Sequence, residues 1–249
     1  MYIYVYDNFL SEKKYANFLA KTESRLHDLG VQGKICQLHI LKNIRSVIED
    51  TMRGSSGTLV AVGNDQTFNK MVNVAAELGL VLGFIPATSK CQTSQLLGMS
   101  NSELACEIIA QRLIKDIDLA YINDYAFISS AQVVGGSPVL DFGDYTVKPT
   151  QENVQIFLCN LSSFPDVNNN PTDGILEAVL RPENNSLKAW FKKKAAPKSS
   201  VIPFQKLKIK NEGEPCAVSV DDHIVFKTPV EISVKPKSLK VIVGTSRSF

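Results

Sequence analysis

The sequence predicts an α/β domain with a parallel sheet, followed by a β-rich domain with the character of an antiparallel sandwich. In the first part, short apolar runs alternate with longer helical patterns, which is typical of βαβ units and a parallel sheet. After residue 118, short β-rich runs follow one another between Pro, Gly and Asn turns. We therefore expect an α/β domain over 1–118 and a β-rich domain over 119–249.

Composition limits the classes of protein that the chain could belong to. The chain has 249 residues, of which 44% are hydrophobic, so one large or two modest domains can each bury a core. The formal net charge of +2 gives no reason to expect a nucleic acid partner. No window reaches the roughly 18 apolar residues of a membrane span. Residues 1–7 lack the basic start and cleavage site of a signal peptide.

Cysteine and histidine usage favours a cytoplasmic protein without a metal site of the zinc type. The five cysteines are widely spaced and contain no C-x-x-C pair, which is typical of reduced thiols rather than of a disulfide framework. His27, His39 and His223 are equally isolated, so a metal site built from them is not expected. We predict a cytoplasmic location, with contact at a membrane that is at most peripheral.

The first predicted elements form a βαβ unit. Residues 3–6 predict a strand, and Ser11 is the expected cap of an amphipathic helix that runs to about Leu29. Residues 36–41 predict a second strand, and 44–52 a second helix.

The stretch from Thr58 to Ser89 is central to the prediction. The apolar run Leu59–Val62 predicts a buried strand of a parallel sheet, and it ends in the polar turn Gly63-Asn64-Asp65-Gln66-Thr67. A helix beginning near Phe68 follows and stops at Gly79. A second buried strand over 80–85 leads into another polar turn that ends at Ser89. Ligands of open α/β sheets bind at the carboxyl ends of strands, where both turns fall.

The remaining elements separate the two halves. A helix from about Ser102 to Ile114 closes the α/β half. The runs that predict strands of the β-rich half are 125–129, 155–160, 175–180 and 206–210.

The two polar turns are similar to motifs of the diacylglycerol kinase catalytic domain, the lipid-kinase branch of the superfamily that also holds the NAD kinases. That family has G-G-D-G-T in the first turn, and three of the five positions match Gly63-Asn64-Asp65-Gln66-Thr67. Its second turn reads I-P-x-G-T-x-N-D. Here Ile85 and Pro86 match, and Ser89 is a conservative replacement.

The resemblance continues to the end of the chain. Residues 171–176 resemble the family's D-G-x-L-d turn and strand, and 211–215 stand where it has D-G-E-P. Residues 228–232 and 236–243 resemble its two closing strands, and the family's fold implies that the last strand returns to the first domain.

Two departures stand out. The family opens with an N-P-x-x-G turn, of which Asp7-Asn8-Phe9-Leu10-Ser11 keeps only the asparagine. The family also inserts a partly helical segment on its acceptor-lipid side, between the strands near Phe127 and Phe157. Here 135–138 is expected to lead almost directly onward.

The resemblance implies an ATP-dependent and Mg-requiring phosphotransferase that acts on a hydroxyl of a lipid or lipid-like acceptor. The alternative is a catalytically inactive pseudokinase that serves as a binding or scaffold module. The resemblance implies that the α/β domain binds a nucleotide and that the β-rich domain is the substrate-side domain for the acceptor. The chain could also form a homodimer. The implied site comprises catalytic Asp65, Glu212 and Glu214, magnesium ligands Asp65 and Asp173, and the nucleotide-binding residues Gly63, Asn64, Gln66, Thr67, Thr88 and Ser89.

Each acidic candidate also has a structural interpretation. Asp65 could hold magnesium beside the transferred phosphate, because Mg²⁺ takes one or two carboxylates together with phosphate oxygens, or it could cap the helix near Phe68. Glu212 could be the general base for the acceptor hydroxyl, or it could belong, with Glu214, to a charged β-turn. Asp173 could be an acidic residue near magnesium, or it could stabilise the turn that precedes Gly174. We expect the first turn to face a cleft, with Glu212 and Glu214 on the opposite wall.

The replaced glycines bear on catalysis. Asn64 tolerates a left-handed backbone. Gln66 would cost roughly 1–2 kcal/mol if its φ were positive, and its side chain would fill space where phosphate lies. Thr88 replaces a further glycine of the second turn, and several such losses together could abolish transfer.

A basic cluster accompanies Trp190 and Phe191. It comprises Lys192, Lys193, Lys194, Lys198, Lys206, Lys208 and Lys210. It could touch an anionic lipid surface or a nucleic acid, or it could be a solvated loop and strand face.

Overall fold

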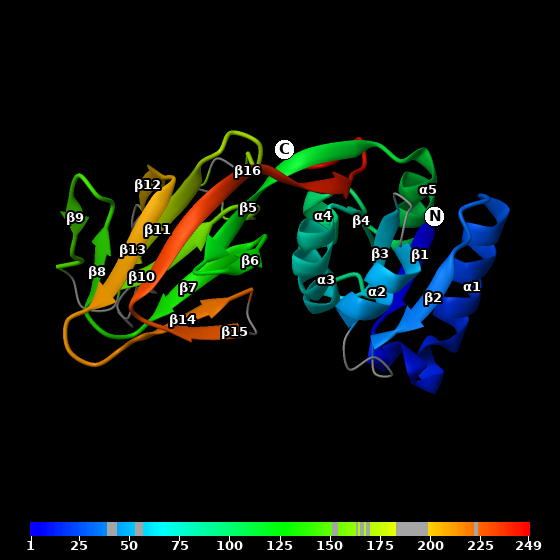
Figure 1. Cartoon of the computed structure of the whole chain (residues 1–249), viewed down its shortest axis with the longest axis horizontal. Helices are drawn as coiled ribbons and strands as arrows, with labels where there is room; N and C mark the ends of the chain where they lie inside the picture. The colour runs from blue at the N-terminus through cyan, green and yellow to red at the C-terminus, as the bar shows by residue number, and fades with distance from the viewer. Residues whose placement is uncertain are drawn as a thin grey trace, which may run out of the picture. The chain divides into compact units, whose positions relative to one another are not determined.

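The computed structural model describes residues 1–38, 44–52, 57–150, 154–162, 164, 167, 170–182, 199–221 and 224–249. They form two compact units (Figure 1). The α/β unit contains Met1–Ile117 and Lys237–Phe249, and the β-rich unit contains Asp118–Pro236. The predicted fold class is confirmed: the first unit has parallel strands with helices, and the second is built from antiparallel strands.

The sheet of the α/β unit is parallel. Its strand order is β2 (Lys34–Gln37), β1 (Tyr2–Tyr6), β3 (Thr58–Gly63) and β4 (Val81–Pro86), followed by β16 (Val230–Ile242), which pairs with β4 through Lys240 and Val241. Every residue of β3 and β4 is buried, as expected for strands that are covered on both faces.

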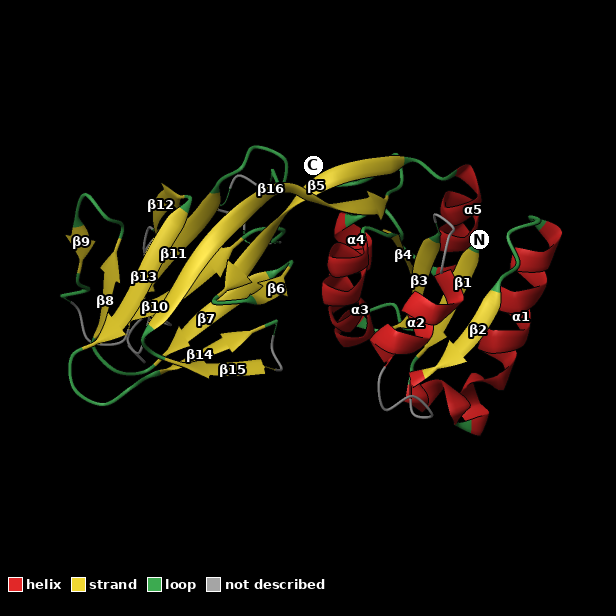
Figure 2. Cartoon of the chain, viewed as in Figure 1, coloured by secondary structure: helices red, strands yellow, loops and turns green. Residues whose placement is uncertain are grey.

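Among the described residues, the α-helices that accompany this sheet are α1 (Ala16–Asp28), α2 (Ile44–Met52), α3 (Asp65–Leu78), α4 (Gln92–Leu96) and α5 (Ser102–Gln111). Figure 2 shows α1 and α3 on opposite sides of the strands. The apolar face of α3 packs on the sheet, with the ring of Phe68 centred 4.9 Å from that of Phe84. Gly79 ends α3 in a left-handed conformation (φ 62°), as the sequence predicts.

Three predictions for the first half are wrong in their limits. The first helix begins at Ala16, because Asp7 caps a 3₁₀ turn, η1 (Asn8–Ser11), and a second turn, η2 (Lys13–Tyr15), follows. Ser11 therefore does not cap α1. The second strand ends at Gln37, and residues 39–43 lie outside the described residues.

The ends of α3 and α5 also differ from the prediction. Helix α3 begins at Asp65 rather than near Phe68, because Asn64 caps it. Helix α5 ends at Gln111, where Arg112 adopts φ 55° and breaks the helical path. The chain then forms β5 (Ile114–Ile122), a strand that the sequence pattern did not predict.

The β-rich unit is a sandwich of two layers. One layer contains β5, β6 (Tyr125–Phe127), β8 (Pro138–Asp141), β9 (Thr146–Val147), β13 (Lys206–Asn211) and most of β16. The other has the order β12 (Ser200–Phe204), β11 (Leu176–Pro182), β10 (Val154–Cys159), β7 (Ser130–Val134), β14 (Ala217–Val220) and β15 (Ile224–Lys227). Their inward side chains form one apolar core, with Phe127, Leu158, Leu180, Leu207 and Ile232 among its members.

Two predictions for this half are also corrected. The segment after Phe127 does not lead directly onward, because it forms β7, β8 and β9 before β10 begins. The two closing strands expected at 228–232 and 236–243 are one continuous strand, β16, which pairs with β13 at its start and with β4 at its end.

Candidate functional site

The first polar turn is a tightly bonded helix start. Asn64 caps α3: its side-chain oxygen accepts the N–H of Thr67 at 3.0 Å, and Thr67 Oγ1 accepts the N–H of Asn64 at 3.1 Å. Gly63 makes room for this arrangement, since a Cβ there would lie 2.2 Å from Thr67 Oγ1. The glycine at the strand end therefore serves the packing of Thr67.

Asn64 and Gln66 do not cause the backbone strain that the loss of two glycines could have produced. Asn64 is extended, with φ −113° and ψ −176°, and Gln66 lies within α3 in a helical conformation. Neither position uses the left-handed backbone that only glycine adopts freely. The side chain of Gln66 is exposed at the first turn of the helix.

Asp65 connects the first polar turn to α4, the helix that follows the second turn. Its Oδ2 atom accepts the N–H of Gln92 at 2.9 Å, and Oδ1 accepts the N–H of Thr93 at 3.0 Å. Asp65 therefore caps a helix, as the structural interpretation supposes, but the helix is α4 and not its own. Cys91, at the N-cap position of α4, makes no capping bond with its side chain, so Asp65 supplies the missing acceptor.

The second turn lies beside the first. The N–H of Ala87 donates to the carbonyl of Gly63 at 2.7 Å. Thr88 Oγ1 lies 3.3 Å from the buried thiol of Cys91, and burial raises the pKa of that thiol. The carbonyl of Ser89 accepts from Gln95 Nε2 of α4 at 3.3 Å. The structure thus brings together the seven candidate residues of the α/β unit.

Asp7 belongs to this cluster, although the sequence did not single it out. Its Oδ2 atom accepts from Thr67 Oγ1 at 2.7 Å, and its N–H donates to the carbonyl of Val62 at 3.0 Å. The carboxyl ends of β1 and β3 are therefore joined by a side-chain and a backbone hydrogen bond, and those of β3 and β4 by the backbone bond between Ala87 and Gly63. The position of Asp7 directly after a predicted strand was the signal that could have identified it.

The start of α3 has the groups that a magnesium-bound phosphate needs. Among the described residues, no acceptor takes the N–H of Asp65 or of Gln66, and such N–H groups at a helix N-terminus favour an anion. A phosphate there would lie beside the Asp65 carboxylate, so a cation between them would be required. No three His, Cys, Asp or Glu side chains of the described residues converge on a metal position, but Mg²⁺ bound to phosphate oxygens needs only one or two carboxylates.

The other acidic candidates lie in the β-rich unit, at the two ends of β13. Asp173 is exposed, and its Oδ1 atom accepts the N–H of Ile175 at 3.0 Å. The neighbouring carbonyl of Gly174 accepts from Gln205 Nε2, directly before β13. Glu212 follows β13 at its other end, on the order of 20 Å away at the usual rise of a strand. The structure therefore does not bring Asp173 and Glu212 together.

Glu212 and Glu214 lie on an exposed turn. Glu212 forms an ion pair with Lys148, and its N–H donates to the carbonyl of Ser137 at 3.2 Å. The carbonyl of Glu214 accepts from Asn211 Nδ2 at 2.5 Å. The turn therefore has its own bonding, and the carboxylate of Glu214 is exposed to solvent.

Other acids gather at the end of the β-rich unit that holds Asp173. Asp118 is fully buried, and its Oδ2 atom accepts the N–H of Gly174 at 2.6 Å. Asp221 accepts from the N–H groups of Ser129 and Ser130. Glu177, on β11, is 7% exposed, and burial, with a smaller effect from Asp173, raises its pKa to about 7. Asp221 could have been noticed in the sequence, since it ends one alternating run and precedes another.

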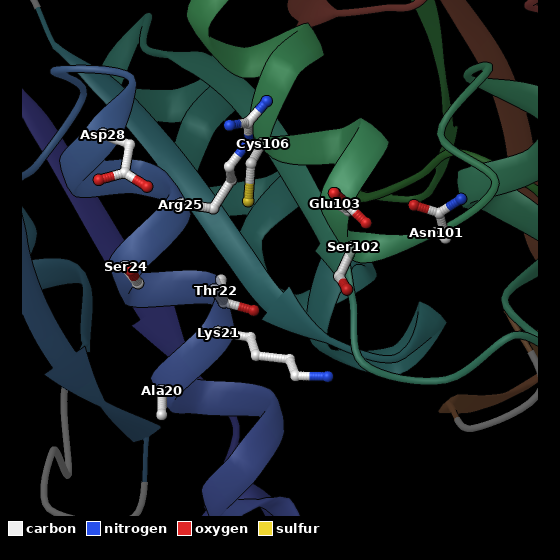
Figure 3. A pocket seen from close by; sticks show the side chains of 10 residues that line it. All are labelled: Ala20, Lys21, Thr22, Ser24, Arg25, Asp28, Asn101, Ser102, Glu103 and Cys106. Atoms are coloured by element: carbon white, nitrogen blue, oxygen red, sulfur yellow. The ribbon is translucent and has the colours of Figure 1, made fainter.

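Two pockets lie away from these residues. One, of about 730 Å³, lies between α1 and the start of α5, and Figure 3 shows Lys21 and Arg25 from α1 beside Ser102 and Glu103 from α5. The other, of about 510 Å³, is in the β-rich unit and is lined by Phe142, Tyr145, Phe204 and Lys206, among others. Neither includes a residue that the sequence predicted for the site.

The basic cluster is only partly described. Lys206, Lys208 and Lys210 are exposed on β13, and Lys208 forms an ion pair of 3.5 Å with Glu231. Trp190, Phe191, Lys192, Lys193, Lys194 and Lys198 lie outside the described residues.

In the part of the chain that the structure describes, no helix has the length and apolar character needed to cross a bilayer. The five cysteines are all buried and unbridged.

The two-unit fold, with paired turns at the carboxyl edge of a parallel sheet, is the fold of a solved diacylglycerol kinase. The crystal structure of a diacylglycerol kinase from Bacillus anthracis str. Sterne superimposes with a TM-score of 0.78 at 17% identity, and the match covers 99% of this chain and 97% of that one. A second structure from the same organism gives 0.81 at 16% identity over 99% and 96%. A third gives 0.77 at 15% identity over 98% of both chains.

The sequence itself matches one family model. Residues 3–122 match the diacylglycerol kinase catalytic domain, which confirms the family resemblance that the turns indicate. A comparison with curated proteins gives no match. The matched residues include both polar turns, Asp7 and α4, and the match ends before Asp173, Glu212 and Glu214.

Proposed function

We propose that the protein is a lipid-kinase-like phosphotransferase that moves the γ-phosphate of ATP, with Mg²⁺, to a hydroxyl of a lipid or lipid-like acceptor. One observation carries this proposal: the start of α3 offers the free N–H groups of Asp65 and Gln66 beside the Asp65 carboxylate. The same turn is held against the second turn by the bond between Ala87 and Gly63. The family match over residues 3–122 supports the class of reaction.

In this proposal each candidate has a defined task. The N–H groups of Asp65 and Gln66 bind phosphate oxygens, with Asn64, Thr67, Thr88 and Ser89 shaping the turns around them. Magnesium would supply positive charge that neutralises the phosphates, and Asp65 would hold it. Since both oxygens of Asp65 accept bonds from α4, the cation would share their remaining lone pairs. Asp173 lies at the opposite end of β13 from Glu212, so it would serve as a second acid near magnesium only if a base outside the turn after β13 takes the proton.

The transfer step needs a base for the acceptor. The acceptor oxygen forms a bond with the γ-phosphorus while the bond to the bridging oxygen of ADP breaks. The proton of the acceptor hydroxyl would pass to Glu212 or Glu214, the exposed carboxylates of the turn after β13. Glu212 would leave Lys148 to do so, whereas the carboxylate of Glu214 is already exposed.

A binding or scaffold module without turnover is the second candidate. The observation that favours it is the pair of hydrogen bonds that the Asp65 carboxylate accepts from α4, because they give this carboxylate a structural role that needs no magnesium. The exposed side chain of Gln66 at the helix start would also crowd a phosphate. Such a module could still bind a nucleotide.

Two measurements test the proposal. Calorimetric titration with ATP and Mg²⁺ should give saturable binding, and the ligand should raise the melting temperature. Transfer of labelled phosphate from ATP to dispersed diacylglycerol or sphingosine should follow. Binding without transfer to either lipid would support the binding module, and the absence of nucleotide binding would reject the kinase proposal.

A further inference from the structure

Helix α4 is held at both ends. At its start, Asp65 accepts the N–H groups of Gln92 and Thr93. At its end, the carbonyl of Leu96 accepts the N–H of Ser248 at 3.0 Å. The carbonyl of Leu97, just beyond, accepts the N–H of Gly244 at 2.8 Å. Residues 244–249, which follow the last strand, therefore hold the end of α4 opposite to Asp65.

The contact between residues 244–249 and the loop after α4 has no free space. Gly98 has φ +82°, and a Cβ on it would lie 2.8 Å from the backbone nitrogen of Arg247. A Cβ on Gly244 would lie 2.7 Å from the carbonyl oxygen of Gly98. Ser246 Oγ donates to the same oxygen at 3.4 Å. Because the two backbones lie this close, a side chain added at Gly98 or Gly244 would displace residues 244–249 relative to the loop after α4.

A helix of this length cannot determine its own position. Helix α4 has five residues, too few to be stable alone, so its ends and neighbours place it. Besides the bonds to Asp65, Gln95 Nε2 donates to the carbonyl of Ser89 in the second turn. A shift of α4 would therefore move an acceptor group of each polar turn.

We propose that residues 244–249 position α4 and, through it, the carboxylate of Asp65 and the second turn. This inference rests on the proposed function for its consequence, which is that the segment sets the affinity for nucleotide. Ser246 and Ser248 are positioning residues, since they donate hydrogen bonds to the carbonyls of Gly98 and of Leu96 at the end of α4. Because coupling between two sites is reciprocal, nucleotide bound at the turns should in turn protect the segment from proteolysis.

Two glycines give a matched pair of variants. Gly98→Ala adds a Cβ at a left-handed position, where it would clash with the backbone of Arg247. Gly30→Ala also adds a Cβ at a left-handed position (φ +69°), but no atom lies within 4 Å of it. Both variants carry similar backbone strain, and only the first displaces residues 244–249. A variant that ends at Gly244 removes Ser246 and Ser248 without adding strain, and it replaces Gly98→Ala if that protein does not fold.

Hydrogen exchange of the Gln92 and Thr93 amides reports the position of α4 without any ligand. We expect exchange at both amides to rise roughly tenfold in Gly98→Ala relative to Gly30→Ala, with exchange in β3 unchanged. The dissociation constant for ATP with Mg²⁺ should rise by a similar factor, again only in Gly98→Ala.

The outcomes separate the inference from the proposed function. Equal exchange at Gln92 and Thr93 in the two variants would overturn the positioning role. Faster exchange with an unchanged dissociation constant would overturn its consequence for nucleotide binding. If the parent protein binds no ATP while exchange rises in Gly98→Ala, the kinase proposal fails and the mechanical coupling holds.

Discussion

The Oδ1 atom of Asp65 accepts the backbone N–H of Thr93 at 3.0 Å. This bond joins the first turn of α3 to the first turn of α4, across 28 positions of sequence. The residue in the family's aspartate position thus has a structural role whether or not a cation also binds it. Replacement of Asp65 by asparagine separates the two roles.

Asp65→Asn should lower stability slightly and nucleotide binding strongly. Asparagine keeps one acceptor oxygen, so one of the two bonds to α4 survives, and the loss in unfolding free energy should be about 1 kcal/mol. The negative charge that would hold Mg²⁺ is gone. We expect the affinity for ATP with Mg²⁺ to fall, as measured by calorimetry.

Asn101→Ala is the matched control for this change. Asn101 caps α5 by accepting the N–H of Leu104 at 2.9 Å, so its loss removes a cap without touching the turns. Similar losses of stability in both variants, with weaker nucleotide binding in Asp65→Asn alone, support a magnesium role. Unchanged binding in Asp65→Asn would leave the residue as a cap.

Rebuilding the family's first turn tests whether the chain is adapted to its own residues. Asn64→Gly with Gln66→Gly should lower the unfolding free energy by about 1 kcal/mol, since a cap weakens and a helix gains a glycine. In a decayed kinase, the freed space should tighten ATP binding. In a working kinase, Asn64 and Gln66 contact the nucleotide, and binding should weaken.

Lys70→Gly corrects for the helix cost in that experiment. Lys70 is exposed on α3, one turn beyond Gln66, so its replacement adds a helical glycine away from the turn. The change in dissociation constant is read relative to this variant. No nucleotide binding by either form would reject both versions of the kinase hypothesis.

Much of the α/β half could be predicted because its signals are local. Strands β3 and β4 are continuous apolar runs, and Gly79 ends α3 where the pattern stops. The side-by-side position of the two polar turns followed from the rule for carboxyl ends of parallel strands. The elements that were not predicted have weak patterns: β5 alternates irregularly, and α4 is a single short turn with no side-chain cap of its own.

The hydrogen bonds of the site could not be predicted, because they join residues far apart in the sequence. The groups that donate to the carboxylates of Asp65 and Asp7 belong to residues 28 and 60 positions away, and sequence spacing does not show such contacts. The capping role of Asn64 was available in the sequence, because Asn at that position with Thr three residues later is a capping pattern. The role of Glu212 and of Glu214 stays a prediction.

The stability of the protein should fall as pH rises through the range in which Glu177 ionises. Burial raises the pKa of this carboxyl from its ordinary value of 4.5 to about 7, so the folded chain keeps a proton that the unfolded chain has lost. Stability from this group is therefore complete below pH 4.5 and is lost as pH rises through about 7. Asp173 and Cys159 are titratable groups that interact electrostatically with Glu177.

Glu177→Gln should remove this dependence in a buffer with chelator. The amide keeps the shape of the protonated acid and cannot ionise. The unfolding free energy of the variant should therefore equal that of the parent at pH 4 and exceed it by roughly 3 kcal/mol at pH 8. Chemical denaturation at the two pH values measures the difference. Glu49→Gln, at an exposed position of α2, is the control, and a parent curve parallel to that of Glu177→Gln would contradict the shift.

Glu212 and Glu214 should differ from Lys148 in their effect on turnover. If Glu212 is the general base, Glu212→Gln should lower the rate of phosphate transfer on the order of 10²-fold and leave the affinity for ATP unchanged. The ion pair with Lys148 is exposed on both sides, so its loss should cost at most about 1 kcal/mol. Lys148→Ala breaks the same pair but keeps the carboxylate, and its turnover should stay near that of the parent.

Glu214→Gln, measured in parallel, shows which of the two acids takes the proton. Equal turnover in Glu212→Gln, Glu214→Gln and Lys148→Ala would give the two acids a role in the turn only and would remove both from the kinase proposal.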